Sequence, residues 1–473
     1  MKNGLLIGVS LLAALVLTLV LVAGTFAPKE DTSNTSVTSV NKETQQAAPL
    51  PDSEIPATET DQANEKEQEQ EQESEPKPEN ASNISNSAQG SSDAARASRT
   101  AEPVLGYAIA ADNRPALPIP AEKLPVSTVS FVACGDNLIH SSIYNDAKTL
   151  AAGTDREYNF LPMYENVADI IKAADLALIN QESPFGGDAR PISGYPLFNT
   201  PDQAGYDLVT LGFDIISIAN NHMLDSTSAG YERTIDFWDR QENVVAIGGY
   251  KNKEDFENIR IVEKNGITIA LLAYTYGTNG LTLPKNSSLV IPLYDDETID
   301  RQTQAARKLA DFVIVSVHWG VEDNFTPNGD QKRKAQIMVD NGVDVIIGHH
   351  PHVLQPMKWA ERPDGGKTLI MYSLGNFLSG MMYSRNMVGG IMGFDLVKAP
   401  NGCSVENAYF IPTVCQYNAS VRGFKIYRFS EYTEELQAAH GAHKFDPSMS
   451  MRSMRKIIED AIPGEFLIED FYS

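Results

Sequence analysis

Histidine positions are the feature of this sequence that most clearly indicates chemistry. The chain holds 8 histidines, and 6 of them come at or just after short apolar runs, as do three other polar residues. The set is Asp136, His140, Glu182, Asn221, His222, His318, His349, His350 and His352. Each histidine alone would more readily be a packed or capping residue, but together these groups would cost several kcal/mol to bury without a cation. The set therefore predicts a divalent metal site.

The ligand types narrow the choice of metal. Imidazole nitrogens stand beside carboxylate and amide oxygens, and mixed sites of this kind suit Zn, Mn or Fe better than Ca or Mg. We therefore expect one of these three metals as the cofactor.

Five apolar runs precede these residues, and they predict the elements that position the site. Each has about 5 or 6 residues, is rich in Val and Ile and does not alternate with polar residues, which is typical of strands covered on both faces. The predicted strands span residues 129–134, 176–180, 215–219, 313–317 and 343–347. Ligands bind beyond the carboxyl ends of strands in open α/β sheets, so we expect the polar residues to meet in one crevice.

Amphipathic segments between the strands predict helices. In the first, over 200–212, Thr200 is expected to cap the helix in a capping box with Gln203, and Gly212 to end it. Two more are predicted over 296–310 and 331–342. Asn265–Gly266 and residues 364–366 predict hairpin turns. This alternation indicates a layered α/β domain over residues 126–430, followed by a polar helical extension over 431–473.

The N-terminal part has a different composition. Residues 5–27 are almost wholly apolar after Lys2, which predicts a membrane anchor within 1–27 with the rest of the chain outside. The alternative is a signal peptide cleaved near Ala27, which would leave a secreted protein. Residues 28–125 are rich in Glu, Gln and Ser and predict a disordered acidic linker.

Charge and cysteine content limit the partners and the compartment. The formal net charge is −24, and no basic stripe with interleaved aromatic residues appears, so we expect no nucleic-acid partner. Three cysteines are too few for a disulfide framework. Cys134 is expected to be a buried thiol, whereas Cys403 and Cys415 are either free or bridged.

Six ordered motifs resemble a known family. They read GDNLIH, NQES, NNHMLD, VHWG, GHHPHVLQP and SLGNF, and they fall between residues 127 and 412. They are similar to the CapA family of poly-γ-glutamate capsule synthesis proteins, which is related to calcineurin-like metallophosphoesterases. The resemblance implies a four-layer α/β/β/α sandwich with a two-metal centre.

The resemblance also implies a role for each matching residue. Asp136 and His352 would bind the first ion, and Glu182 stands where the related enzymes have a bridging carboxylate. The second ion would be bound by Asn221, His318 and His350. His222 would donate a proton or stabilise the transition state. Independently of the resemblance, Asp225 is expected to orient His222 or Asn221 through a hydrogen bond or, equally well, to cap a helix.

One position departs from the family pattern. The related phosphoesterases have a histidine where Leu138 stands in this chain. Either His140 replaces that ligand across a wider spacing, or one metal site is weaker. His349 is expected to lie behind the ligands rather than among them.

Three further residues have two interpretations each. Asn376 lies either near the site or in a turn, and Trp319 either forms a wall of the pocket or packs in the core. Arg190 either binds a substrate anion or is a solvated loop residue.

The functional expectation has two forms. The first is metal-dependent hydrolysis, or a related transfer, at a phosphoester or amide of a surface polymer. The second is a non-catalytic assembly or export component of a poly-γ-glutamate capsule system. Either form would place the protein at the membrane with a polymer or small anionic substrate, and with other capsule-synthesis membrane proteins as candidate partners.

Overall fold

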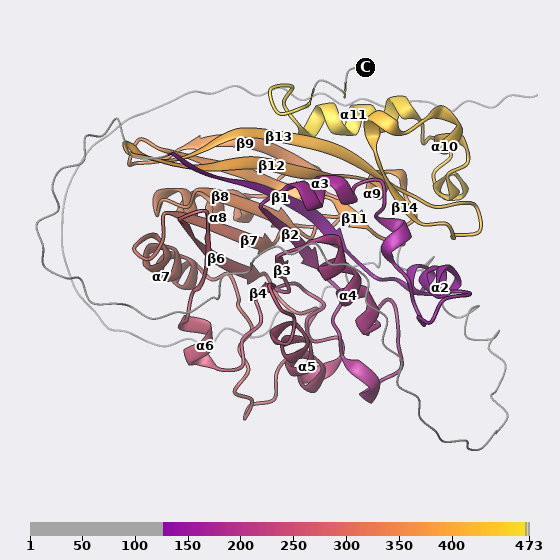
Figure 1. The fold of residues 1–473 in the computed structure, drawn as a ribbon, viewed down its shortest axis with the longest axis horizontal. Helices are drawn as coiled ribbons and strands as arrows, with labels where there is room; N and C mark the ends of the chain where they lie inside the picture. The colour runs from indigo at the N-terminus through magenta and orange to yellow at the C-terminus, as the bar shows by residue number, and fades with distance from the viewer. Residues whose placement is uncertain (1–125, 469–470, 472–473) are drawn as a thin grey trace, which may run out of the picture. The chain divides into compact units, whose positions relative to one another are not determined.

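The computed structural model describes residues 126–468 and 471, and these residues form two mixed β-sheets flanked by helices (Figure 1). In this part of the chain the first sheet has the strand order β14-β13-β12-β1-β2-β3-β4, with β11 paired to β1. Its strands are β1 (Ser127–Asn137), β2 (Leu176–Gln181), β3 (Ile215–Ser217), β4 (Val245–Ile247), β11 (Asn376–Leu378), β12 (Val388–Ala399), β13 (Gly402–Gln416) and β14 (Lys425–Arg428). β1 to β4 are parallel, whereas β12, β13 and β14 run antiparallel to their neighbours.

The second sheet has the order β5-β6-β7-β8-β10-β9. Its strands are β5 (Arg260–Lys264), β6 (Ile267–Thr275), β7 (Phe312–His318), β8 (Val345–His349), β9 (Leu354–Glu361) and β10 (Lys367–Leu374). The four central strands are parallel, and the edge strands β5 and β9 are antiparallel to their neighbours. Both predicted hairpins are confirmed: Asn265–Gly266 joins β5 to β6, with φ of 53° and 75°, and residues 364–366 join β9 to β10.

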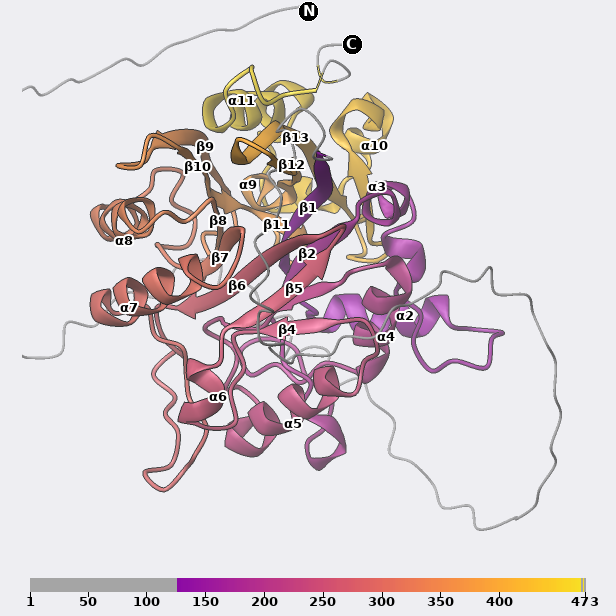
Figure 2. The same cartoon turned by 60° about the vertical axis from the view of Figure 1, so that its left-hand side comes forward.

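Alternate residues of the second sheet face two different layers. Ile269 and Leu271 of β6 belong to the large core shared with the first sheet. Ala270 and Leu272 face the other way, into a separate core formed with two helices. These are α7 (Asp296–Arg307) and α8 (Gly329–Asp340). Figures 1 and 2 both show this helix pair beside β6, β7 and β8.

The helices that connect β1 to β4 belong to the first sheet. They are α2 (Ser141–Leu150), α3 (Ala168–Ala173), α4 (Asp202–Leu211) and α5 (Thr227–Asp239). Right-handed crossovers between parallel strands in sequential order place the helices on one face of the sheet. The second sheet packs on the opposite face, so these helices cover the outside. The predicted mixed α/β architecture is confirmed.

Short elements complete the described chain. They are α6 (Lys253–Glu257), α9 (Ser384–Met387), α10 (Glu434–Ala438), α11 (Met451–Ala461) and the 3₁₀ turns η2 (Leu161–Met163), η3 (Gly187–Ala189), η4 (Phe429–Glu431) and η5 (Gly441–Lys444).

Helix α4 corrects one detail of the sequence-based prediction. Its N-cap is Pro201, without a side-chain cap, and the Thr200 hydroxyl is buried with no hydrogen-bond partner among the described residues. The backbone N–H of Thr200 instead bonds to the carbonyl of Pro184 at 2.9 Å, which holds Thr200 in the preceding loop. Gly212 ends the helix in the left-handed conformation, as predicted, with φ 104°.

The C-terminal extension is helical, as predicted, but it is not only a polar surface element. Met454 and Ile458 of α11 are buried in the main core, together with Phe466 and Phe471. Helix α11 packs against β9 and β12, and both views show it beside these strands. Its apolar stripe is narrow, so the surrounding polar residues dominate the composition.

The predictions for the cysteines and for the N-terminal segment have different outcomes. All three cysteines lie in the described part and are free. Cys403 and Cys415 stand in the same strand, β13, where about 40 Å separates residues twelve apart, so they cannot bridge each other. The predicted anchor and linker lie outside the described residues, and within those residues no helix is long and apolar enough to cross a membrane.

Candidate metal centre

The carboxyl ends of five parallel strands meet at one place. Asp136 lies near the end of β1, Glu182 follows β2, and Asn221 follows β3. His318 ends β7 and His349 ends β8, and the two are paired in register. The polar residues predicted to meet at the strand ends do meet there, but the strands belong to two sheets rather than one.

Two groups of potential ligands share one carboxylate. Among the described residues, Asp136, Glu182 and His352 form one group, and Glu182, His318 and His350 form another. In each group the ligand atoms lie within 4.8 Å of one another, and every member is buried. Glu182 thus occupies the shared position that the family resemblance implied for it.

Asn221 joins the second group. The Nε2 atom of His318 lies 2.9 Å from Asn221 Oδ1 and 3.4 Å from Glu182 Oε1. Two atoms each about 2.1 Å from one Zn²⁺ lie about 3.0 to 3.4 Å apart in octahedral or tetrahedral arrangements. These separations match those of ligands around a common ion, and the shorter one is also that of a hydrogen bond.

Unpartnered polar atoms test whether the residues fit a cation. Neither carboxylate oxygen of Glu182 nor Nδ1 of His350 has a hydrogen-bond partner within the described part of the chain, and all are buried. A buried carboxylate without a partner costs several kcal/mol, which a cation would offset. The donor set, with two carboxylates, an amide oxygen and three imidazoles, fits divalent metal ions.

The electrostatics of the histidines depend on their neighbours. Burial holds the pKa values of His318 and His350 well below their usual range, so both imidazoles are neutral, the form that binds metals. His352 behaves differently. Burial lowers its pKa, but the charges of Glu182 and Asp136 outweigh that effect and raise the pKa to about 10.

The two carboxylates also differ. Burial raises the pKa of Glu182 to about 8, against the opposing charge of His352. Burial acts in the same direction on Asp136, but hydrogen bonds and charges from His349 and His352 hold its pKa well below the usual range. Asp136 therefore gives up its proton far more readily than Glu182 does.

Hydrogen bonds fix Asp136 from several sides. Asn180 Nδ2 donates to Oδ1 at 2.8 Å, and His349 Nδ1 lies 3.1 Å from the same oxygen. The backbone N–H of His350 donates to Oδ2 at 3.2 Å. His349 therefore lies behind Asp136 and orients it, which is the position expected for this histidine.

The backbone of the His350–His352 segment is strained. His350 has φ 96° and His352 has φ 56°, values that side chains other than glycine rarely adopt. His352 Nδ1 lies 3.0 Å from Asn376 Oδ1 and 3.2 Å from Asp136 Oδ2, and its Nε2 faces Glu182 Oε1 at 3.7 Å. Asn376 is therefore adjacent to the site, consistent with the first of its two interpretations.

His222 and Asp225 form a hydrogen-bonded pair. His222 Nδ1 lies 2.7 Å from Asp225 Oδ2, which also accepts the backbone N–H of Phe198 at 2.9 Å. Burial lowers the pKa of His222, but the hydrogen bond and charge of Asp225 outweigh it and raise the pKa above its usual value. With Nδ1 bonded to Asp225, Nε2 is the atom available to hold and donate a proton.

The structure does not bring His140 into either ligand group. The backbone N–H of Gly380 donates to His140 Nδ1 at 3.1 Å, and burial lowers the pKa of His140 to about 3. A neutral imidazole has one N–H and one lone pair, so the proton stands on Nε2 and no lone pair remains for a metal. Leu138 is itself buried, so neither residue supplies the absent ligand in this arrangement.

Two other candidates from the sequence have clear surroundings. The indole Nε1 of Trp319 donates to the carbonyl of Tyr372 at 2.8 Å, and its ring packs in the core under α7 and α8 rather than forming a wall of the site. Arg190 Nη1 donates to the backbone carbonyl of Asp225, which places the guanidinium beside the residue that holds His222.

Two residues near the site were not predicted from the sequence. Tyr276 follows β6, and its ring lies 4.6 Å from that of His350 and parallel to that of His318 at 6.2 Å. Glu322 forms a third possible ligand group with His350 and His352. The apolar run that ends before Tyr276 was a signal of the same kind as the other five, whereas Glu322 lies in a loop with no such signal.

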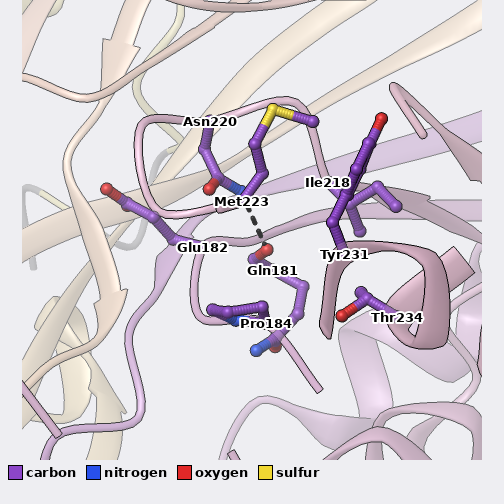
Figure 3. Close-up of a pocket in the computed structure, with 8 residues that line it drawn as sticks. All are labelled: Gln181, Glu182, Pro184, Ile218, Asn220, Met223, Tyr231 and Thr234. Atoms are coloured by element: carbon purple, nitrogen blue, oxygen red, sulfur yellow. Dashed lines mark hydrogen bonds between the residues drawn. The ribbon is translucent and has the colours of Figure 1, made fainter. Parts of the chain in front are cut away.

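A small cavity borders the shared carboxylate. Its lining consists of Gln181, Glu182, Pro184, Ile218, Asn220, Met223, Tyr231 and Thr234 (Figure 3). Within it, Asn220 Nδ2 donates to the carbonyl of Gln181 at 3.1 Å. This bond joins the residue before Glu182 to the residue before Asn221, and so fixes the two ligands relative to each other.

The fold and site together define an α/β protein with a candidate divalent-metal site of the kind that supports metal-dependent hydrolysis. The chain belongs to the family described as "Bacterial capsule synthesis protein PGA_cap", which matches residues 130–381. The family resemblance expected from the six motifs is confirmed.

Individual relatives agree with this family. The chain is 31% identical over 243 residues to the "PGA biosynthesis protein CapA" of Bacillus subtilis, covering 51% of this chain and 62% of the relative. It is 31% identical over 189 residues to the "Capsule biosynthesis protein CapA" of Bacillus anthracis, covering 39% of this chain and 44% of the relative. The matches thus span less than two thirds of either relative's length.

A solved structure is also similar, at a lower level. A "novel phosphatase" from Mycoplasma pneumoniae superposes with a TM-score of 0.37 and 14% identity, covering 61% of this chain and 95% of that one. A TM-score this low does not establish a shared fold, so the fold rests on the strand order described above.

Proposed function

We propose that this chain is a metal-dependent hydrolase, or a related transferase, that acts on a phosphoester or amide of poly-γ-glutamate capsule or another cell-envelope polymer. The observation that supports this most is the pair of ligand groups sharing Glu182. Two neighbouring divalent ions of Mn, Fe or Zn are the cofactor that such a pair would hold. Divalent ions at such sites activate water as a nucleophile and polarise the bond that breaks.

The residues of the chain provide the remaining functions. Asp136, Glu182 and the amide of Asn221 supply oxygen ligands, and the imidazoles of the second sheet supply nitrogen ligands. His222 donates a proton from Nε2 to the leaving group, because Asp225 holds its other nitrogen and favours the protonated form. Arg190, beside Asp225, supplies a positive charge for an anionic group of the substrate.

The location forms part of the proposal. A helix within residues 1–27 would anchor the protein to the membrane, with a disordered linker over 28–125 carrying the domain outside the cell. Signal cleavage near Ala27 would instead release it. In both cases the substrate is a surface polymer or small anion, and other capsule-synthesis membrane proteins are candidate partners.

A metal analysis combined with a substrate screen tests the hydrolase proposal. The full chain is purified in detergent, and Mn, Fe and Zn are measured by mass spectrometry. Phosphodiester, phosphomonoester and γ-glutamyl substrates are then assayed with Glu182→Ala as the matched inactive variant. Metal-dependent turnover that is absent in the variant supports the proposal, and a wild-type protein that binds no metal contradicts it.

A non-catalytic role in capsule assembly or export is the second candidate. It is favoured by the names of the two relatives, which state capsule or PGA biosynthesis rather than a reaction. Glu182→Ala and His350→Ala variants separate the two functions when they replace the wild type in cells. Loss of the capsule or wall phenotype supports catalysis, and full retention at normal protein levels supports the assembly role.

A further inference from the structure

We propose that Glu322, with His350 and His352, completes the metal centre on its solvent side. The ligand of this group is a divalent cation. The inference rests on the proposed metal centre, and it adds a ligand that neither the strand ends nor the family motifs identified.

The first ligand group lacks the histidine that related enzymes have at the position of Leu138. Asp136, Glu182 and His352 are its three members, and Leu138 cannot bind a metal. His140, the other candidate, has Nδ1 occupied by the N–H of Gly380 and lies outside the groups formed by the described residues. Neither Leu138 nor His140 therefore adds a ligand to this group.

Glu322 is a further carboxylate that the fold places beside His350 and His352. One of its oxygens lies within 4.8 Å of the ligand nitrogens of His350 and His352. Its side chain is exposed, with no hydrogen bond or ion pair within the described residues. This separates it from its neighbour Asp323, whose carboxylate binds Arg385 and Asn386.

The buried side chain of His350 also supports a cation beside Glu322. Its side chain is 4% exposed, and Nδ1 has no hydrogen-bond partner among the described residues. A buried imidazole nitrogen without a partner is unfavourable without a ligand. A cation between His350 and Glu322 would satisfy this nitrogen.

The loop that carries Glu322 is tied to the loop that carries the two histidines. Trp319 N–H donates to the carbonyl of His349 at 3.1 Å, and Asp323 N–H donates to that of Pro351 at 2.9 Å. Asn386 Nδ2 donates both to Asp323 Oδ1 at 2.8 Å and to the carbonyl of His352 at 3.3 Å. Bonds on both sides of Glu322 thus hold its backbone beside His350 and His352.

The exposure of Glu322 suits a ligand that can dissociate from the ion. Glu322 is the exposed member of a group whose other members are buried, so it faces the direction from which substrate must approach. A carboxylate there can bind the ion in the resting protein and be displaced by an oxygen of the substrate. Substitution of Glu322 should therefore lower the affinity for the metal more than it lowers the rate of the chemical step.

The test compares Glu322→Gln with two matched variants of the full chain in detergent. Glu232→Gln changes an exposed glutamate on α5, and His140→Gln removes the rival ligand. Each protein is stripped, and Mn²⁺ or Zn²⁺ binding is measured by titration calorimetry and mass spectrometry. Circular dichroism confirms folding, and Glu322→Asp provides a second variant that keeps the charge.

Glu322→Gln should lose one ion, or bind one ion about 10-fold more weakly or worse, while Glu232→Gln and His140→Gln match the wild type. Glu322→Asp should retain part of the affinity. Equal binding by Glu322→Gln and the wild type, or loss of an ion in His140→Gln instead, overturns the inference while leaving the proposed function intact. Absence of metal from the wild type would overturn both.

Discussion

The two sheets contribute different chemistry to the same site. The first sheet supplies the oxygen ligands Asp136, Glu182 and Asn221, each at the end of one of its parallel strands. The second sheet supplies imidazoles, at His318 and on the segment that follows β8. Apart from the proposed ligand Glu322, which follows β7, each sheet supplies one kind of ligand. The centre therefore depends on the packing of one sheet against the other. Because the sheets supply different ligands, substitutions in each sheet should have different effects.

The largest effect is expected for Glu182→Ala, because Glu182 belongs to both groups. This variant should lose both ions and fall to the background rate, a loss of about 10⁴-fold or more. His350→Ala, from the second sheet, should lose one ion and keep the other. Metal counting by mass spectrometry distinguishes the two variants, and equal metal content in both would contradict the shared position of Glu182.

A smaller effect is expected for His222→Ala, also on the side of the first sheet. His222 is bonded to Asp225 and lies outside the ligand groups of the described residues, so metal content should stay at the wild-type level. The rate should fall by about 10²- to 10³-fold, the usual contribution of a general acid. The loss should be smaller for substrates whose leaving group needs no proton. A variant that also loses metal would instead place His222 among the ligands.

The pH dependence of metal binding sharpens the comparison further. Because the fold raises the pKa of Glu182 to about 8, the protonated carboxyl stabilises the metal-free fold. This stabilisation is complete below about pH 4.5 and is lost as the pH rises through 8. His352, with a pKa of about 10, acts in the same direction. Metal must displace these protons, so affinity should rise by about tenfold per pH unit for each proton released.

Thermal melting measures this effect. The increase in melting temperature on adding Mn²⁺ or Zn²⁺ should be larger at pH 8 than at pH 5.5. The low pKa values of His318 and His350 leave them neutral at both pH values, so they add no proton to displace. An increase that shrinks between pH 5.5 and 8 would mean that Glu182 and His352 do not bind the metal.

The smallest effect is expected for Arg190→Gln. The guanidinium beside Asp225 should contribute about 1.5 to 3 kcal/mol to binding an anionic substrate, so KM should rise by about 10- to 150-fold. Metal content and kcat should change little. Arg240→Gln, at the C-cap of α5, is the matched control. An unchanged KM for anionic substrates would mean that Arg190 only supports the loop.

Much of the site could be predicted from the sequence, because periodicity identifies strands and their last residues. The division of the strands between two sheets could not, since an apolar run does not reveal which strand it pairs with. His140 shows the same limit. Its nitrogen is occupied by Gly380, which is 240 positions away in the chain. Glu322 lies in a loop whose path depends on tertiary contacts, so residue spacing alone could not place it, whereas the strand before Tyr276 was a usable signal.

The left-handed backbone at His350 and His352 implies a conflict between stability and function. Each such residue costs about 1 to 3 kcal/mol, and glycine would relieve the cost. The chain instead keeps imidazoles there, so the metal-free protein is less stable than its fold allows. A metal-free His350→Gly protein should therefore melt at a higher temperature than His350→Ala, although neither can assemble the full centre. In energetic terms, the bound ion acts as a folding ligand for this segment.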